Sequence, residues 1–62
     1  MTATVHPLLL SVPEAAATLA LSTRAVYRLI DGGHIEAVHI GRATRIPTQA
    51  LEAYVQQLRE TA

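Results

Sequence analysis

Residues 22–47 change their hydrophobic periodicity once, at the adjacent glycines Gly32 and Gly33, and this change limits the folds open to the chain. At about 100° per residue, residues 23–31 place their polar side chains on one arc and their bulky apolar side chains on the opposite arc, as in an amphipathic helix. Ser22 offers an N-cap, and a glycine suits the other end because it reaches positive φ without steric cost. The segment predicts a short helix with a distinct polar face.

A β-hairpin and a last helix are predicted after the glycines. Ile35–Ile40 is rich in β-branched residues and predicts a strand, Gly41-Arg42 predicts a turn, and residues 43–46 predict the returning strand. Pro47 ends this strand, and Thr48 can cap a helix. The apolar residues of that helix repeat at i, i+3, i+4 and i+7, namely Leu51, Tyr54, Val55 and Leu58.

An earlier helix is predicted from Val12 or Pro13 to about Leu19. Ser11 and Glu14 have the spacing of a capping box, and Ala20-Leu21 predicts the turn to the next helix. Residues 1–7 predict a flexible tail.

This order of elements predicts a mainly α fold with a small β-hairpin, a winged helix-turn-helix, as a single domain over residues 8–60.

Leu8, Leu9 and Leu10 form an apolar run far below the ~20 residues that span a bilayer, so we expect a strand or packing segment and no membrane contact. The 62 residues include no Cys, Phe or Trp. The core must therefore come from Leu, Val, Ile and Tyr, without a disulfide or a cysteine zinc site.

The charges of the chain are unevenly distributed although the net charge is zero. Residues 22–47 carry a local charge of +2, and the remainder carries −2. One face can therefore approach phosphates while the other repels them, which is the distribution expected of a nucleic-acid-binding domain.

The polar arc of residues 23–31 is the predicted surface for reading DNA. Arg24 lies in the first turn, where residues of a recognition helix reach base edges, and its planar fork matches guanine O6 and N7. Tyr27 shares this arc, so we expect its hydroxyl to bond a phosphate or its ring to contact a thymine methyl. Thr23 and Arg28 complete the set. The alternative is an ordinary solvated helix face with a partly packed ring.

Arg42 and Arg45 are the candidate DNA contacts of the hairpin. Arg42 follows Gly41 at the predicted tip, where an arginine can enter a minor groove with its negative potential. Arg45 has the opposite strand parity to Ile46, so we expect it to point outward toward phosphate. The alternative for both is solubility or protection of an edge strand.

Neither a metal site nor a catalytic site is predicted. His34 and His39 have opposite parity on or beside a strand, and His6 lies in the tail, whereas a structural zinc site takes four convergent ligands. There is no cysteine, glycine-rich phosphate loop or pair of carboxylates on a predicted site, and Ser11 and Ser22 are better explained as caps. We expect a protein that is not an enzyme and binds no cofactor.

Four segments in order resemble the excisionase-like branch of the MerR superfamily, a group of small winged-helix proteins. They are Leu10-Ser-Val-Pro-Glu-Ala-Ala, Leu21-Ser-Thr-Arg-Ala-Val-Tyr-Arg-Leu-Ile, Ala37-Val-His-Ile-Gly-Arg and Arg45-Ile-Pro. The resemblance covers about residues 9–58. It implies a helix in the major groove through Thr23, Arg24, Tyr27 and Arg28, and a wing in the adjacent minor groove through Arg42.

The resemblance also implies phage or mobile-element biology in the bacterial cytoplasm, in association with the nucleoid. Excisionases are recombination directionality factors that bind tandem sites in attachment DNA, bend it and help a partner integrase to excise the prophage. Two other functions stay open: a small transcription regulator with the same domain, and a protein-interaction module such as an antitoxin.

The chain departs from this family at four positions. Ala20 replaces the usual turn glycine, so we expect a tighter or strained turn. Asp31 and His39 stand at positions that are often basic, and Glu36 stands where a hairpin proline is common. Fewer cations release fewer counterions, so we expect weak binding by one monomer and cooperative head-to-tail assembly on DNA.

Overall fold

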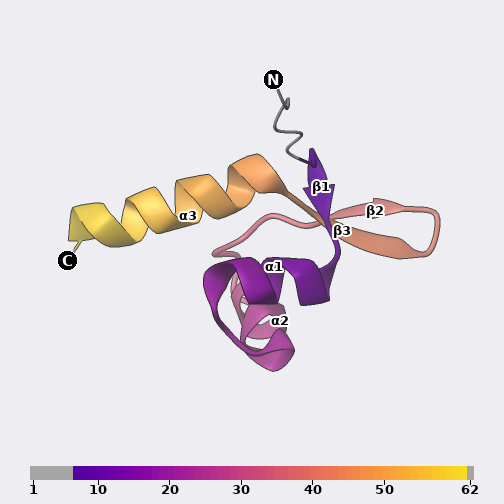
Figure 1. Ribbon diagram of the computed structural model, residues 1–62, viewed down its shortest axis with the longest axis horizontal. Helices are drawn as coiled ribbons and strands as arrows, with labels where there is room; N and C mark the ends of the chain where they lie inside the picture. Colours follow the sequence, from indigo (N-terminus) through magenta and orange to yellow (C-terminus); the bar gives the residue numbers. More distant parts are fainter. Residues whose placement is uncertain (1–6, 62) are drawn as a thin grey trace, which may run out of the picture.

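The computed structural model describes residues 7–61 and contains three helices and three short strands within that range. The elements are β1 (Leu9–Leu10), α1 (Val12–Leu19), α2 (Thr23–Asp31), β2 (Val38–Ile40), β3 (Ala43–Pro47) and α3 (Thr48–Thr61). The helix-turn-helix, the hairpin and the last helix follow in the predicted order (Figure 1). The tail predicted over residues 1–7 lies outside the described residues, apart from Pro7.

Helix α1 begins with the predicted capping box. The Glu14 N–H donates to Ser11 Oγ at 3.2 Å, and the Ser11 N–H donates to Glu14 Oε1 at 2.9 Å. The bond from the Ser11 backbone, followed by the interaction with its hydroxyl, lowers the pKa of Glu14. Two backbone donors at the helix start are thereby satisfied within four residues, which fixes where the helix begins.

Helices α1 and α2 both end in a Schellman motif. At the end of α1, the Leu21 N–H donates to the Ala16 oxygen at 2.8 Å, and Ala20 has φ 59° and ψ 39°. At the end of α2, the His34 N–H donates to the Leu29 oxygen at 2.9 Å, and Gly33 has φ 78°. The strain expected at Ala20 is confirmed, because this residue adopts the left-handed conformation with a Cβ.

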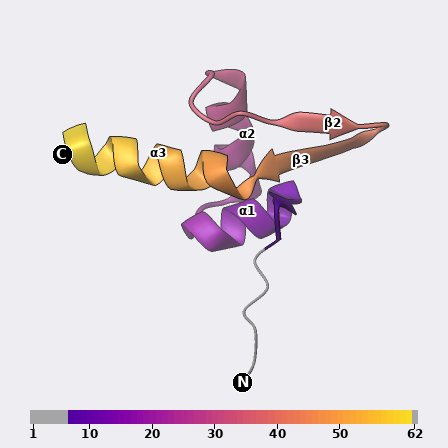
Figure 2. The same cartoon turned by 90° about the horizontal axis from the view of Figure 1, so that it is seen from above.

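The three strands form one antiparallel sheet in the order β1-β3-β2. Leu10 lies opposite Ile46, while on the other side of β3 Val38 pairs with Arg45 and Ile40 pairs with Ala43. The apolar run at residues 8–10 is thus a strand, one of the two roles expected of it. Figures 1 and 2 show the hairpin of β2 and β3 and helix α3 projecting in opposite directions from the α1–α2 pair.

The predicted strand Ile35–Ile40 is too long, because only Val38–Ile40 belongs to β2. Ile35 lies four residues after the end of α2, and its N–H donates to the Leu29 oxygen at 3.3 Å. Its side chain is buried in the core. A β-branched residue is needed here for packing between elements, so composition alone placed the strand boundary wrongly.

The core lies where α1, α2, the sheet and the first turns of α3 meet. Its fully buried large side chains are Val26 and Ile46. Ala15 and Ala16 are buried on α1, and their small size lets α1 and α2 approach closely. The complete buried cluster is Leu10, Val12, Ala15, Ala16, Val26, Ile35, Ile46 and Leu51.

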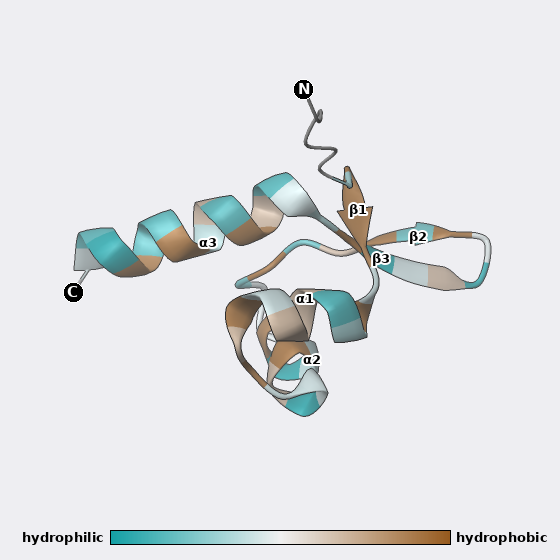
Figure 3. Ribbon diagram, viewed as in Figure 1, coloured by the Kyte–Doolittle hydropathy of each residue, from teal (hydrophilic) through white to brown (hydrophobic). Residues whose placement is uncertain are grey.

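Helix α3 is anchored at its start and exposed toward its end. Leu51 is buried, whereas Val55 is 41% exposed and Leu58 is 48% exposed. Figure 3 shows hydrophobic segments along one side of an otherwise hydrophilic α3. The predicted apolar stripe is therefore correct as a pattern, but only its first part packs on the described domain.

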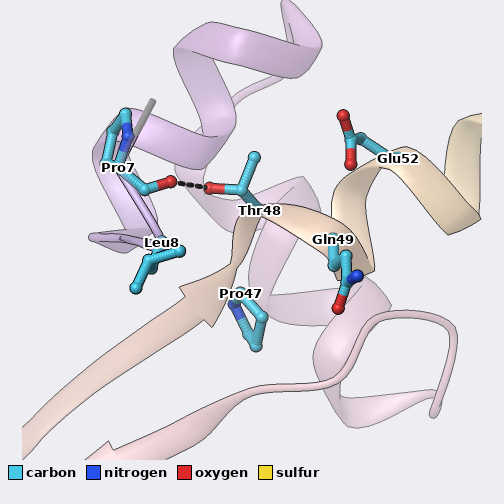
Figure 4. A pocket seen from close by; sticks show the side chains of 6 residues that line it. All are labelled: Pro7, Leu8, Pro47, Thr48, Gln49 and Glu52. Atoms are coloured by element: carbon cyan, nitrogen blue, oxygen red, sulfur yellow. Dashed lines mark hydrogen bonds between the residues drawn. The ribbon is translucent and has the colours of Figure 1, made fainter. Parts of the chain in front are cut away.

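The cap predicted at Thr48 is wrong, since Thr48 is the first helical residue of α3. Its hydroxyl donates to the Pro7 carbonyl (Figure 4), and its N–H donates to the Leu8 carbonyl at 3.0 Å. Pro47 pairs with Leu9 immediately before it. Thr48 therefore joins the β1 segment to the start of α3, a contact between distant parts of the chain that local spacing does not reveal.

Candidate nucleic-acid interface

Helix α2 presents its whole predicted polar arc to solvent. Val26 is fully buried, and Leu29 and Ile30 pack against the core as partly buried residues. The side chains on the opposite arc are all exposed, namely Thr23, Arg24, Tyr27, Arg28 and Asp31. The division of this helix into an apolar and a polar half is confirmed, and the polar half is free to enter a groove.

The N-terminal turn of α2, which carries Arg24, is held in place from two sides. The Ser22 side chain accepts a hydrogen bond from the Ala25 N–H at 3.1 Å, which confirms the predicted cap. Val26, one turn along, is anchored in the core against α1. Arg24 therefore lies in a capped first turn that is held in place, which is the part of a recognition helix that reaches bases.

The hairpin turn carries Arg42 at its tip. Gly41 has φ 60° and Arg42 does not have positive φ, the combination found in a two-residue type II′ turn. This turn matches the twist of the flanking strands, so Gly41 closes the hairpin without splaying it. Arg42 is exposed, and the hairpin carries it away from the α1–α2 pair (Figure 2).

Arg45 lies in a different environment from Arg42. It is partly buried, and its Nη1 donates to the Thr44 carbonyl at 2.9 Å. Its positive charge also contributes, as the smallest cause, to the lowered pKa of Glu14 at the start of α1. The structure thus gives Arg45 contacts within the domain, whereas Arg24, Arg28 and Arg42 extend into solvent. Its contact with phosphate stays a prediction.

The hairpin also carries two exposed residues that the sequence did not single out as DNA contacts. His39 lies opposite Thr44, and its Nδ1 is 3.3 Å from the Thr44 hydroxyl. Ile40 is 60% exposed directly before the turn. The exposure of Ile40 could not be predicted from the sequence, because the residues around it are typical of any strand. It follows only from the position of the hairpin outside the core.

The described part of the chain offers neither a metal-binding cluster nor a membrane-spanning helix. Residues 7–61 contain no group of three or more His, Asp or Glu side chains placed to hold a metal ion. None of the helices in that range is both long enough and apolar enough to cross a membrane. The exposed arginines of α2 and the hairpin define the candidate site.

Comparison with known proteins defines the class of this domain. Residues 9–59 match the helix-turn-helix domain family, and the chain belongs to this family. Its fold of three helices and a small antiparallel hairpin is a winged helix-turn-helix.

Two relatives narrow the class to its excisionase-like members. The chain is 40% identical over 53 residues to an excisionase of Streptomyces ambofaciens, with 86% of each chain covered. It is 46% identical over 50 residues to a protein of Saccharopolyspora erythraea named "Probable excisionase", a match that covers 81% of this chain and 51% of the relative. The chain thus spans about half the length of the second of these relatives.

Proposed function

We propose that this chain is a sequence-specific, architectural DNA-binding protein that binds attachment-site DNA and promotes excision of a phage or related element by a partner integrase. The observation that carries the proposal is the exposed polar arc of α2, which stands opposite a fully buried Val26 and beside a projecting basic hairpin. The names of its relatives support excision as the process served. Membership of the MerR superfamily and action at the bacterial nucleoid form part of the same proposal.

Binding places α2 in the major groove. Arg24 donates in a bidentate manner to a guanine, while Thr23, Tyr27 and Arg28 bond phosphates or contact a thymine methyl. Arg42 enters the neighbouring minor groove, where the negative potential is strongest if the groove is narrow. Arg45 donates to the phosphate backbone of the DNA at the base of the wing. The protein supplies shape and contacts, and the integrase supplies the chemistry.

Assembly on DNA is cooperative and head to tail. Residues 22–47 carry a local charge of only +2, so one monomer binds weakly, near the non-specific range of about 10⁻⁴–10⁻⁶ M at physiological salt. Leu8 is 86% exposed at one end of the domain, and Val55 and Leu58 are exposed on α3. Contact between the Leu8 segment of one monomer and the wing or α3 of the next does not close, so it continues along the duplex.

The reading of bases is tested with Arg24→Ala. Competition titrations on duplexes with one site, varied base by base, should show a loss of about 1–3 kcal/mol and a relaxed preference at one base pair. Arg59→Ala is the matched control, because it removes the same charge from the far end of α3. A loss that is equal for all sequences would make Arg24 a phosphate contact and refute its assignment.

Excision and assembly are tested separately. Gel-shift titrations of duplexes with one, two and three tandem sites should show rising affinity per site, whereas equal and independent affinities would refute cooperation. Recombination with the integrase of the same element should require this protein for excision. A protein that binds its site but leaves excision unchanged would instead be a transcription regulator.

A further inference from the structure

Ile40 is an apolar side chain held in solvent at the end of the wing. It is the last residue of β2 before the Gly41-Arg42 turn, and it is 60% exposed. Its cross-strand partner is Ala43, whose methyl group is too small to cover it. Val38, two residues earlier on the same strand face, is already partly buried near the body of the domain.

The position of Ile40 distinguishes it from the other exposed apolar residues of the described chain. Single exposed hydrophobic side chains are common and by themselves indicate nothing. Ile40, however, directly precedes the turn that carries the exposed cation Arg42, on a hairpin that projects away from the helices (Figures 1 and 2). A threonine would suit a strand equally well without leaving a large apolar surface in water. An apolar side chain beside a cation at a projecting tip matches a groove with a negative rim and a stacked, apolar interior.

We propose that Ile40 is a minor-groove wedge, which inserts at a base step while Arg42 binds the walls of the same groove. This inference rests on the proposed DNA binding and assigns its deformation of the duplex to one side chain. Apolar wedges partly unstack a base step and bend the duplex toward the major groove. Because pyrimidine–purine steps unstack most easily, Ile40 also makes the protein prefer TA or CA at a step to which it donates no hydrogen bond.

The test compares Ile40→Val with Ile40→Thr. Both variants keep a β-branched side chain of nearly equal shape, but only threonine places a hydroxyl in the stack. The probe is a one-site duplex, selected from a random library by the wild-type protein, with 2-aminopurine at the wing-side step. His39→Ala is the control, since it alters the opposite face of the same strand. Thermal unfolding of each free variant reports whether the domain remains folded.

At saturating protein, 2-aminopurine fluorescence should rise with wild type, Ile40→Val and His39→Ala, and stay at the level of the free duplex with Ile40→Thr. The bend measured by energy transfer between the duplex ends should fall in parallel. Wild type should prefer TA over GC at this step roughly tenfold, and Ile40→Thr should lose that preference.

Unchanged fluorescence, bend and step preference in a folded Ile40→Thr variant that still binds would overturn the wedge while leaving DNA binding intact. An equal loss of affinity at all steps would overturn it too, because Ile40 would then act without reading deformability. A wild-type protein that selects no duplex would refute the proposed function and the wedge together.

Discussion

Ala20 and Gly33 occupy the same position in two successive Schellman motifs, and exchanging their residue types should change stability in opposite directions. Both have left-handed backbone, with φ 59° at Ala20 and φ 78° at Gly33. A Cβ added at Gly33 would meet no atom within 4 Å, and Ala20 is exposed. The effect of each substitution is therefore almost purely conformational. We predict that Ala20→Gly stabilises the domain and Gly33→Ala destabilises it.

The magnitude follows from two opposing contributions. A left-handed conformation costs a residue with a Cβ about 1–2 kcal/mol. Glycine in turn gives the unfolded chain more freedom, which offsets about 0.4–1 kcal/mol of this gain. Taken at the middle of each range, the net change is about 0.8 kcal/mol in each direction. For a domain of this size, it corresponds to a shift in Tm of about 3–6 °C, upward for Ala20→Gly and downward for Gly33→Ala.

Urea titration and thermal unfolding measure both variants, and an unchanged m-value confirms that only stability has moved. Ala17→Gly is the matched control, because Ala17 is exposed within α1 and not at its end. Glycine there should cost about 0.5–1 kcal/mol. If Ala20→Gly destabilised the domain as Ala17→Gly does, the left-handed strain assigned to Ala20 would be refuted.

Three further predictions concern the cap, the core and the wing. The hydrogen bonds of the capping box lower the pKa of Glu14 in the folded state, so the ionised carboxylate stabilises the domain above the ordinary pKa of glutamate. This stabilisation is lost as the pH falls through the lower pKa of the folded state. Glu14→Gln should therefore reduce the dependence of the unfolding free energy on pH, measured between about pH 3 and 7. Ile46→Ala should lower the free energy of unfolding, measured by urea titration, by about 2–5 kcal/mol because Ile46 is fully buried. A loss no larger than that at an exposed site would contradict its place in the core. Arg42→Ala should lose affinity mainly on A·T-rich flanks, and equal losses on G·C-rich flanks would remove it from the minor groove.

The features that could be predicted from sequence are those set by neighbouring residues. Ser11 and Ser22 cap their helices as expected because each cap is made within three residues of the chain. Gly41 likewise determines its own turn through its φ. The polar arc of α2, including Arg24, followed from the periodicity of a single helix. Local hydrogen bonding and helical spacing were sufficient in all these cases.

The features that could not be predicted depend on residues far apart in the chain. The Thr48 hydroxyl bonds Pro7, which lies 41 residues earlier, so its spacing suggested a cap that does not exist. Ile35 belongs to the core and not to β2, because it fills space where several elements meet. The exposure of Ile40 depends on how far the hairpin stands from the helices. None of these features can be predicted from neighbouring residues alone.

Strand β3 is fixed to the domain at one end, where it pairs with β1, and is free at the other end, beside the hairpin turn. Ile46, near its fixed end, is fully buried and pairs with Leu10, whereas Ala43, at its free end, pairs only with the exposed Ile40. At about 3.4 Å per residue, the three residue steps from Ile46 to Ala43 separate these two conditions by roughly 10 Å. The tolerance of the hairpin to sequence change should rise along this length. Under the proposed function, the residues at the tip other than Gly41, which has positive φ, can therefore vary with the DNA target almost independently of stability.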